Sequence, residues 1–256
     1  MSEQEFQPAS EAAPVAPSLS QLERVTSAFS APSKTFQDIK RGNRSWWMPF
    51  LIFAITGYIL FAAVSMKIGM QQVVDNQTHL NPKQEEKMSQ MPPEQRATAS
   101  KIGLAITEGA FIAGPLFVLA GIALLSLGLW GTINFAFGGK ASYGSIFSMW
   151  FYASLPGIIK PLLGTVVIFA GATPETFNIK NYAPTNVAAF LNPMETNAAL
   201  YSIASSLDII TIWTLILLGI GAATVAGVKR SSGYIAVFAW WAIFVLIGAG
   251  IAAITG

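Results

Sequence analysis

The sequence predicts an all-α, polytopic helical membrane protein with about five transmembrane helices. Hydrophobic residues make up 53% of the 256 residues and charged residues only 11%, whereas charged residues are about 25% of ordinary soluble domains. So few charges leave too little polar surface to coat a soluble particle of this size. The apolar residues also gather in long runs, several of them near the roughly 20 residues that a helix needs to cross a bilayer.

The composition argues against several classes of function. The chain has no cysteine, which excludes disulfides, thiolate metal sites and lipidated cysteines. The one histidine, His79, cannot build a metal cluster. A net charge of +2 gives no basic surface of the kind that binds nucleic acid. We therefore predict no catalytic residue, no metal site and no cofactor, and a protein that is not an enzyme.

The N-terminal part of the chain divides into two regions. Residues 1–18 are rich in Ala, Pro, Ser and Glu, which predicts a disordered tail. Residues 19–45 are predicted to form amphipathic surface helices, with Ser33 as the cap of the second helix. The first helix would carry three apolar residues on one face: Leu22, Val25 and Phe29. These helices lie on the membrane surface or pack on their own protein, and the two interpretations are compatible.

The five-helix transmembrane domain is predicted over residues 46–256. It opens with Trp46 and Trp47, whose amphipathic rings favour the headgroup level. Residues 67–101 are polar and mixed in charge, which indicates a partly helical loop outside the membrane. The predicted spans are residues 46–66, 106–130, 145–170, 203–228 and 234–254.

Small residues recur at helical spacing in two of these spans. A stripe of small residues lets another helix approach closely, so we predict helix-packing seams at these positions. Contacts with other membrane proteins, or self-association, would also use such seams. The seam residues are Gly114, Gly121 and Gly128 in the second span, and Gly219, Ala223 and Gly227 in the fourth.

The third span is interrupted by Pro156 and Pro161, with Lys160 between them. A proline inside a helix removes a backbone hydrogen bond, and broken helices at membrane depth line cavities in transporters. Two further ionisable residues, Glu108 and Asp208, lie within or at the edges of spans. Because a charge inside the bilayer is costly, these three residues are expected to find partners.

This candidate polar site, Glu108, Lys160 and Asp208, has two interpretations. In the first it is a proton or ion relay, and Lys160→Met should alter function more than fold. In the second it is a structural ion pair, or carboxylates wetted at the interface, and the same variant should lose expression and thermal stability. The sequence leaves both open.

The distribution of Lys and Arg predicts the orientation, since short cytoplasmic loops carry their excess. Lys140, Lys229 and Arg230 fall on the same side as the N-terminal segment, which places the N-terminus inside and the C-terminus outside. Lys67 and Lys101 argue the other way. The first strong apolar run begins near residue 46, too late for a signal peptide. The absence of targeting signals fits a multi-pass protein of a bacterial inner membrane.

Several short stretches, taken in order, resemble the bacterial branch of the Yip family, membrane proteins named for interaction with Ypt/Rab GTPases. The stretches are PSKTFQDI at 32–39, WWMP at 46–49, GGKASY at 138–143, YASLP at 152–156, LDI at 207–209, IW at 212–213, GIG at 219–221 and GVKR at 227–230. The resemblance covers roughly residues 30–255. It implies five spans, a cytoplasmic N-terminus and an outer C-terminus. The Asp-Leu-Tyr-Gly-Pro hallmark of eukaryotic members is reduced here to Gly114-Pro115, so their role in Rab-dependent trafficking carries over poorly.

Two functions follow as hypotheses. The first is a non-enzymatic scaffold or adaptor in membrane organisation or trafficking, whose partners are the lipid bilayer and other membrane proteins. The second is a transporter or channel for small solutes, ions or protons that uses the broken third helix and Lys160. An intramembrane enzyme is the weakest hypothesis, because no paired aspartates, Ser/His dyad or zinc motif lies at depth.

Overall fold

A computed structural model describes residues 18–255, so the predicted disordered tail, residues 1–18, lies outside the described residues except for Ser18. Over this range the chain consists of helices joined by turns and loops, with no named strand. Five helical segments are long and apolar enough to cross a membrane, which confirms the fold class. They are α3 (Trp47–Lys67), α7 with the π-helical turn η1 (Gly114–Ala136), α8–η2–α9 (Tyr143–Phe169), α11 (Ile209–Ala226) and α12 (Arg230–Thr255).

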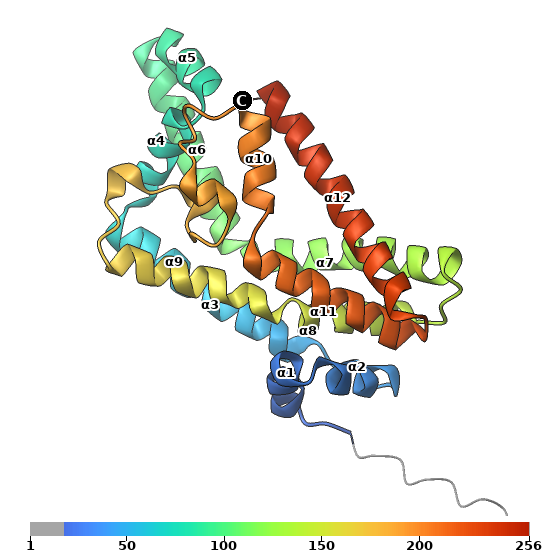
Figure 1. Cartoon of the computed structure of the whole chain (residues 1–256). Coiled ribbons are helices and arrows are strands. Elements are labelled where there is room, and N and C mark those ends of the chain that lie inside the picture. The colour runs from blue at the N-terminus through green and yellow to red at the C-terminus, as the bar shows by residue number, and fades with distance from the viewer. Residues whose placement is uncertain (1–17, 256) are drawn as a thin grey trace, which may run out of the picture.

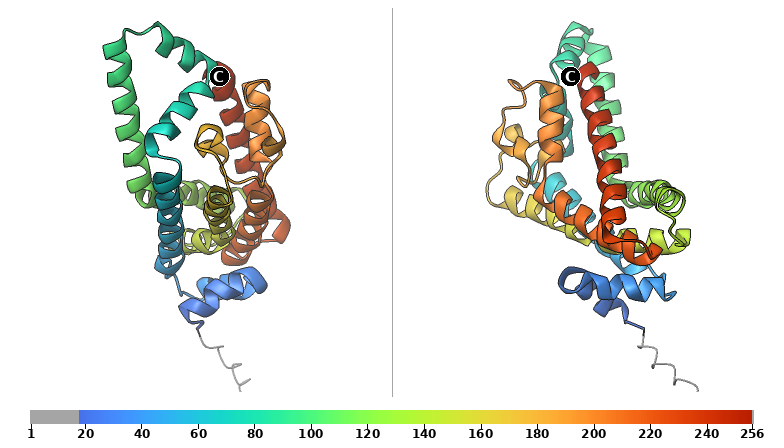
Figure 2. Two further views of the ribbon diagram at one scale, coloured as in Figure 1. Left: turned by 90° about the vertical axis from the view of Figure 1, so that its left-hand side faces the viewer. Right: turned by 45° about the vertical axis from the view of Figure 1, so that its right-hand side comes forward.

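The other helices surround these five segments. Figure 1 shows α1 and α2 together at one end of the molecule, while α4, α5, α6, α10 and the C-terminus gather at the opposite end. The two views in Figure 2 show the same separation. The bounds of these elements are α1 (Gln21–Ser30), α2 (Pro32–Lys40), α4 (Met70–His79), α5 (Pro82–Gln90), α6 (Pro93–Ile112), α10 (Ala198–Ser206), and the 3-10 turns η3 (Pro174–Thr176), η4 (Ile179–Asn181) and η5 (Val187–Phe190).

Two spans begin later than the sequence predicts. The second was expected over 106–130, but the helix breaks at Ala113, and α6 and α7 run in different directions (Figure 1). Pro115 has no N–H to donate into the preceding turn, which explains a break at this point. The fourth was expected over 203–228, but α10 ends at Ser206 and a new helix starts with Asp208 as its N-cap. Hydropathy continues through both breaks and therefore does not reveal them.

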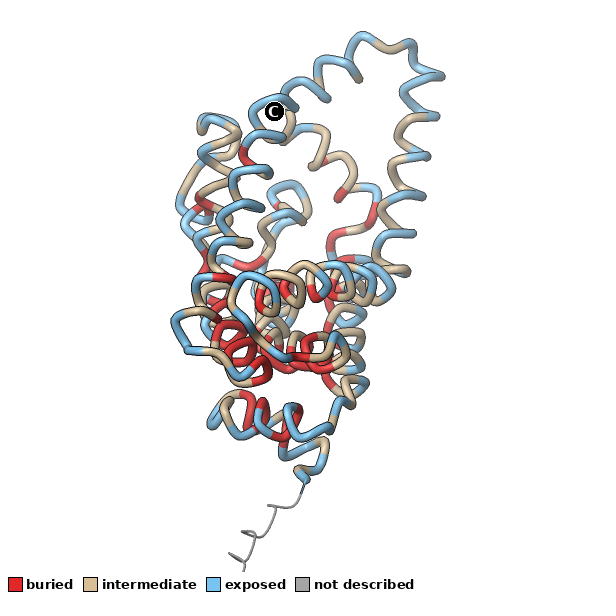
Figure 3. The backbone as a smooth tube through the Cα atoms, turned by 90° about the vertical axis from the view of Figure 1, so that its right-hand side faces the viewer, coloured by how far each residue is buried: buried red, intermediate tan, exposed pale blue. Residues whose placement is uncertain are grey.

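The buried residues form two clusters. The larger one lies where α2, α8 and α11 meet and includes Phe36, Met149 and Leu218. The smaller one joins α3, α4 and α9 around Val64 and Val73. Figure 3 shows the buried residues gathered in the centre of the bundle, with exposed residues along the helices at the C-terminal end. Many of the exposed side chains are large and apolar, as a protein surrounded by lipid requires.

The N-terminal helices pack on their own protein, with α2 seated against α8 and α11. Two details of the prediction are wrong. Ser33 is not a cap: Pro32 is the first residue of α2 and the N-cap position is Ala31. Leu22 is 64% exposed, whereas Arg24 is completely buried. The other two apolar residues of the predicted face, Val25 and Phe29, do pack against the larger cluster, and the guanidinium group of Arg24 also has its partners in the bundle.

Candidate functional site

Two of the three residues of the candidate polar site are in contact. Lys160 lies in the first turn of α9 (Ile159–Phe169), directly after the 3-10 turn η2 (Leu155–Ile158). Its Nζ is 3.1 Å from Oδ1 of Asp208 and donates a hydrogen bond of 3.2 Å to the hydroxyl of Thr211. The side chain of Asp208 is 1% exposed and that of Lys160 is 30% exposed. The ion pair therefore joins the broken third span to the start of α11.

The carboxylate of Asp208 also anchors the loop that precedes α10. Its Oδ1 accepts from the backbone N–H of Thr211 at 2.8 Å, which caps α11, and its Oδ2 accepts from the hydroxyl of Thr185. A short antiparallel pairing continues the contact, because the N–H of Ile209 donates to the carbonyl of Thr185 at 3.1 Å. Asp208 thus fastens three segments that are far apart in the sequence.

The surroundings of Asp208 stabilise its charged form. Burial raises the pKa of its carboxyl group, but the hydrogen bonds from Thr185 and Thr211 and the ammonium group of Lys160 outweigh burial, so the pKa is lower than usual. Burial first, and then the negative charge of Asp208, raise the pKa of the Tyr182 hydroxyl. At neutral pH the carboxylate is therefore ionised and the tyrosine is protonated.

Glu108 does not join this pair. It is half-buried on α6, and within residues 18–255 no hydrogen bond or ion pair connects it to Lys160 or Asp208. Glu108 belongs to α6, which diverges from the second span at Ala113 (Figure 1). The geometry favours the structural-pair interpretation for Lys160 and Asp208, since the other two contacts of the carboxylate serve the cap of α11 and the loop at Thr185.

The break in the third span is a local change of helix type. Helix α8 (Tyr143–Ala153) ends before Pro156, η2 follows, and α9 begins at Ile159. Pro161 falls in the first turn of α9, where its missing N–H would have no partner in any case. Gly157 faces α3, since a Cβ there would lie 3.5 Å from the ring of Phe53. The prolines therefore end one helix and begin another beside α3.

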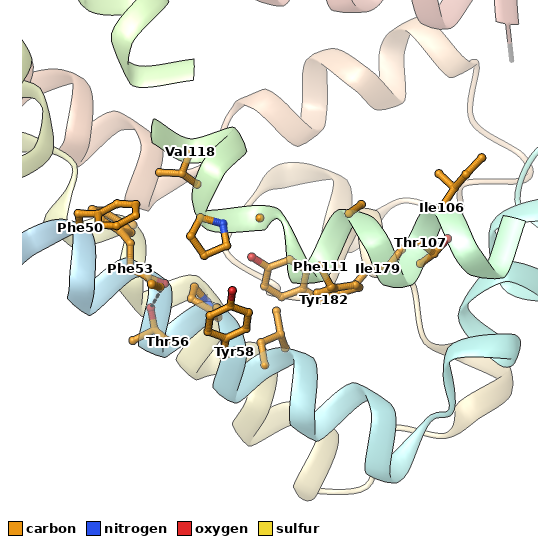
Figure 4. Close-up of a pocket in the computed structure, with 18 of the residues that line it drawn as sticks. Phe50, Phe53, Thr56, Tyr58, Ile106, Thr107, Phe111, Val118, Ile179 and Tyr182 are labelled. Atoms are coloured by element: carbon orange, nitrogen blue, oxygen red, sulfur yellow. Dashed lines mark hydrogen bonds between the residues drawn. The ribbon is translucent and has the colours of Figure 1, made fainter. Parts of the chain in front are cut away.

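A cavity of about 610 Å³ opens beside two of the helix breaks, the one between α6 and α7 and the one between α8 and α9. It lies between α3, the α6–α7 bend and the start of α9, and Figure 4 shows its lining. Pro115 and Pro161, one from each break, lie in its wall. Most of the remaining lining is aromatic or aliphatic, with Phe50, Phe53 and Phe111 among the largest side chains. This is the most apolar of the principal hollows in the described part of the protein.

The six small residues of the predicted seams differ in their surroundings. A Cβ on Gly219 would overlap the ring of Tyr234, and one on Gly128 would lie 3.2 Å from the ring of Trp240, so α12 packs closely on both. Ala223 lies in the same α11–α12 contact, where its Cβ faces Gly233. Gly114 and Gly121 have open space, with no atom within 4 Å of an added Cβ.

Gly227 serves the turn between α11 and α12. Its φ of +72° lies in the left-handed region, which glycine adopts at little cost. Its N–H and that of Val228 both donate to the carbonyl of Ala223, at 2.9 and 3.1 Å. This is the usual way in which a glycine ends a helix. The residue therefore terminates α11 and lets α12 turn back.

A buried network at the N-terminal helices was not foreseen. Nε of Arg24 lies 3.7 Å from the carboxylate of Asp38, and both side chains are almost fully buried. The guanidinium group sits 5.0 Å from the ring centroid of Tyr152 and donates to the carbonyl of Asn43 at 2.9 Å. The capping box formed by Ser20 and Glu23 marks the start of α1 and was visible in the sequence. The partners of Arg24 could not be recognised in the sequence, because they come from distant segments.

Comparison with known proteins points to one family of membrane proteins. The profile of the Yip1 domain matches residues 26–251. The chain is 26% identical over 218 residues to a protein of Bacillus subtilis (strain 168) described as membrane protein YknW, and the alignment covers 85% of each chain. No solved structure matches the chain. The matched region contains Lys160, Asp208 and the helix breaks described above.

Proposed function

We propose that this chain, which belongs to the Yip1 domain family, is a non-enzymatic scaffold or adaptor that binds other membrane proteins. That it is an integral, multi-pass membrane protein follows from the family and from the five spanning segments. The adaptor role rests on one observation, a group of cations at the end of the molecule that carries α2. We call this group the basic face and define it as Lys40, Arg44, Lys140, Lys229 and Arg230.

The basic face is assembled from three segments. Lys140 belongs to the turn after η1, and its N–H donates to the carbonyl of Ala226 at 3.0 Å, which joins that turn to the end of α11. The Nζ of Lys40 would lie 3.3 Å from a Cβ on Gly227, so α2 ends beside the same turn. Arg44 lies against the start of α8, where its Cδ is 3.5 Å from the Cβ position of Gly144.

The five side chains of the basic face are exposed, and none takes part in an ion pair within residues 18–255. Their charge is therefore available for a partner. Exposed charges of one sign steer and select partners of the opposite sign. We propose that the partner is an acidic segment of another membrane protein, and that the basic face lies on the cytoplasmic side of a bacterial inner membrane, in accord with the excess of Lys and Arg there.

Removing charge from the basic face should weaken partner binding. The triple variant carries Lys40→Gln, Lys140→Gln and Lys229→Gln. A photo-crosslinking residue placed at Gln37 should form about tenfold fewer adducts with partner proteins in this variant than in the native protein. Three exposed charges that contribute about 0.5 kcal/mol each account for this factor. The adducts are measured in cells and identified by mass spectrometry. Gln37 is exposed on α2 next to the basic face.

The matched control removes the same charge from the opposite end of the molecule, with Lys87→Gln, Lys101→Gln and Lys180→Gln, all exposed. It should leave the adducts unchanged. The proposal fails if both triple variants behave alike, or if the adducts contain lipid and no acidic protein segment.

A transporter or channel is the second candidate, and the cavity beside the broken third span favours it. Lys160 does not line the cavity, but it directly precedes Pro161, which does, and its side chain is 30% exposed. The charge of Lys160 would then serve a permeating anion or proton. The contacts that hold Asp208 weigh against this, because a relay needs groups that change partners.

A flux assay separates the two candidates. Under the adaptor proposal we expect sealed proteoliposomes that contain the protein to conduct protons and common ions no faster than empty vesicles, and Lys160→Met to leave this flux unchanged. Lys101→Met, on the exposed surface of α6, is the control. Flux that the native protein supports and Lys160→Met abolishes, with folded protein shown by its thermal midpoint, would make the second candidate correct.

A further inference from the structure

We propose that the cavity between α3, the α6–α7 bend and α9 is a binding site for one acyl chain of a membrane lipid. Its volume of about 610 Å³ falls within the range of about 300–1,000 Å³ typical of small-ligand sites. The proposal rests on the cavity alone and does not depend on the basic face or on the identity of a protein partner.

The wall of the cavity is suited to hydrocarbon and poorly suited to water. Two of its polar groups are already committed, because the hydroxyl of Thr56 donates to the carbonyl of Ile52 at 2.9 Å and that of Tyr58 donates to the carbonyl of Ile112 at 2.9 Å. Apolar side chains cover most of the rest (Figure 4). An ordered water needs two to four polar partners, which such a wall offers at few places.

The bilayer itself is the source of the occupant. Part of the cavity wall comes from α3, α7 and the third span, which are apolar enough to cross a membrane. The rest comes from α6, α4 and the loop after α9, which are not among the spanning segments. Apolar side chains at its edges are exposed, among them Ile106, which is 66% exposed, and Val118, which is 38% exposed. In a membrane these edges face acyl chains, so a chain can enter from the side without crossing water.

The two ends of the cavity differ in polarity, as the two ends of a lipid do. Figure 4 places Phe50 and Val118 at one end and Ile106 and Thr107 at the other. Gln77 also lines the cavity and comes from α4, which packs on α6. We assign the polar end of the lipid to the side of Gln77 and Thr107, and the tail to the side of Phe50 and Val118.

Two glycines make the proposal testable without disturbing the packing. Gly57 and Gly114 line the cavity, and a Cβ built on either meets no atom within 4 Å. A large side chain at these positions therefore has room to enter the cavity and to take the place of the ligand. Gly121 has the same open surroundings but does not line the cavity, so it supplies the matched control.

The experiment labels the full-length protein in nanodiscs made of phosphatidylethanolamine and phosphatidylglycerol, with a trace of phospholipid that carries a diazirine in its acyl chain. After photolysis, mass spectrometry measures the lipid attached to peptides containing Phe53 and Phe111. Gly57→Phe should lower this labelling at least about tenfold, as expected when a ligand loses its site. Gly121→Phe should leave it unchanged.

Gly114→Leu is the second variant and repeats the test from the opposite wall, in case Gly57→Phe does not fold. Labelling concentrated on the cavity and lost in either folded variant supports the site. Labelling that persists in both, or that is spread evenly over all lipid-facing helices, overturns it, because ordinary boundary lipid gives that pattern. Neither result depends on the protein partner, so this proposal and the adaptor proposal fail separately.

Discussion

Asp208→Ala is expected to lower the apparent thermal midpoint of the detergent-purified protein by roughly 6 to 12 °C, because a loss of about 3 kcal/mol shifts the midpoint of a protein of this size by about 2 to 4 °C for each kcal/mol. The estimate is at the lower end of the 3 to 5 kcal/mol measured for breaking a buried ion pair, since Lys160 keeps 30% exposure. It includes the N-cap that Asp208 provides to α11, worth about 1 kcal/mol.

Two further variants test whether the ion pair causes the effect. Lys160→Met should be destabilising on its own, since it leaves the carboxylate of Asp208, 1% exposed, without its counter-charge. The double variant Lys160→Met with Asp208→Ala should lose less than the sum of the two single variants, because it removes both charges together. Additive losses, or a shift of less than about 2 °C for Asp208→Ala, would show that the pair does not hold α9 to α11.

The five spans could be predicted from the sequence because only a continuous helix satisfies its backbone inside lipid, and the apolar runs mark such helices directly. The beginnings of the second and fourth spans, directly after Ala113 and Asp208, could not be found by hydropathy, because the apolar runs continue across both positions. The chemistry that breaks these helices was visible, however, since Pro115 lacks an N–H and Asp208 is a favoured N-cap. A search for caps and prolines inside the apolar runs would have moved both boundaries.

The polar site was predicted only in part, because the sequence shows which charges need partners but not which distant groups the fold brings to them. Hydropathy singled out Lys160 and Asp208 as costly charges that need partners, and the two are paired. The same argument selected Glu108, which lies elsewhere because α6 turns away at the bend. The helical period places Arg24 on one face of α1 but cannot identify Tyr152, more than a hundred residues away, as the group opposite it.

Gly233→Val is expected to prevent α12 from packing on α11 and to cost about 3 kcal/mol or more, the upper end of what overpacking usually costs. A Cβ on Gly233 would overlap the backbone oxygen of Gly219 and lie 2.9 Å from the Cβ of Ala223. A backbone atom cannot rotate away as a flexible side chain can, so one helix must move. This contact is among the most extensive between any two helices of the described chain, and the variant should yield little folded protein on size-exclusion chromatography.

Gly250→Val provides the control on the same helix, because a Cβ on Gly250 meets nothing within 4 Å. Both variants replace glycine by valine in α12, so they share any change in helix propensity and in hydrophobicity. They differ in whether another helix approaches the position. If Gly233→Val and Gly250→Val fold equally well, α12 does not pack on α11 as described, and the seam at Gly219 and Ala223 is free to receive another membrane helix.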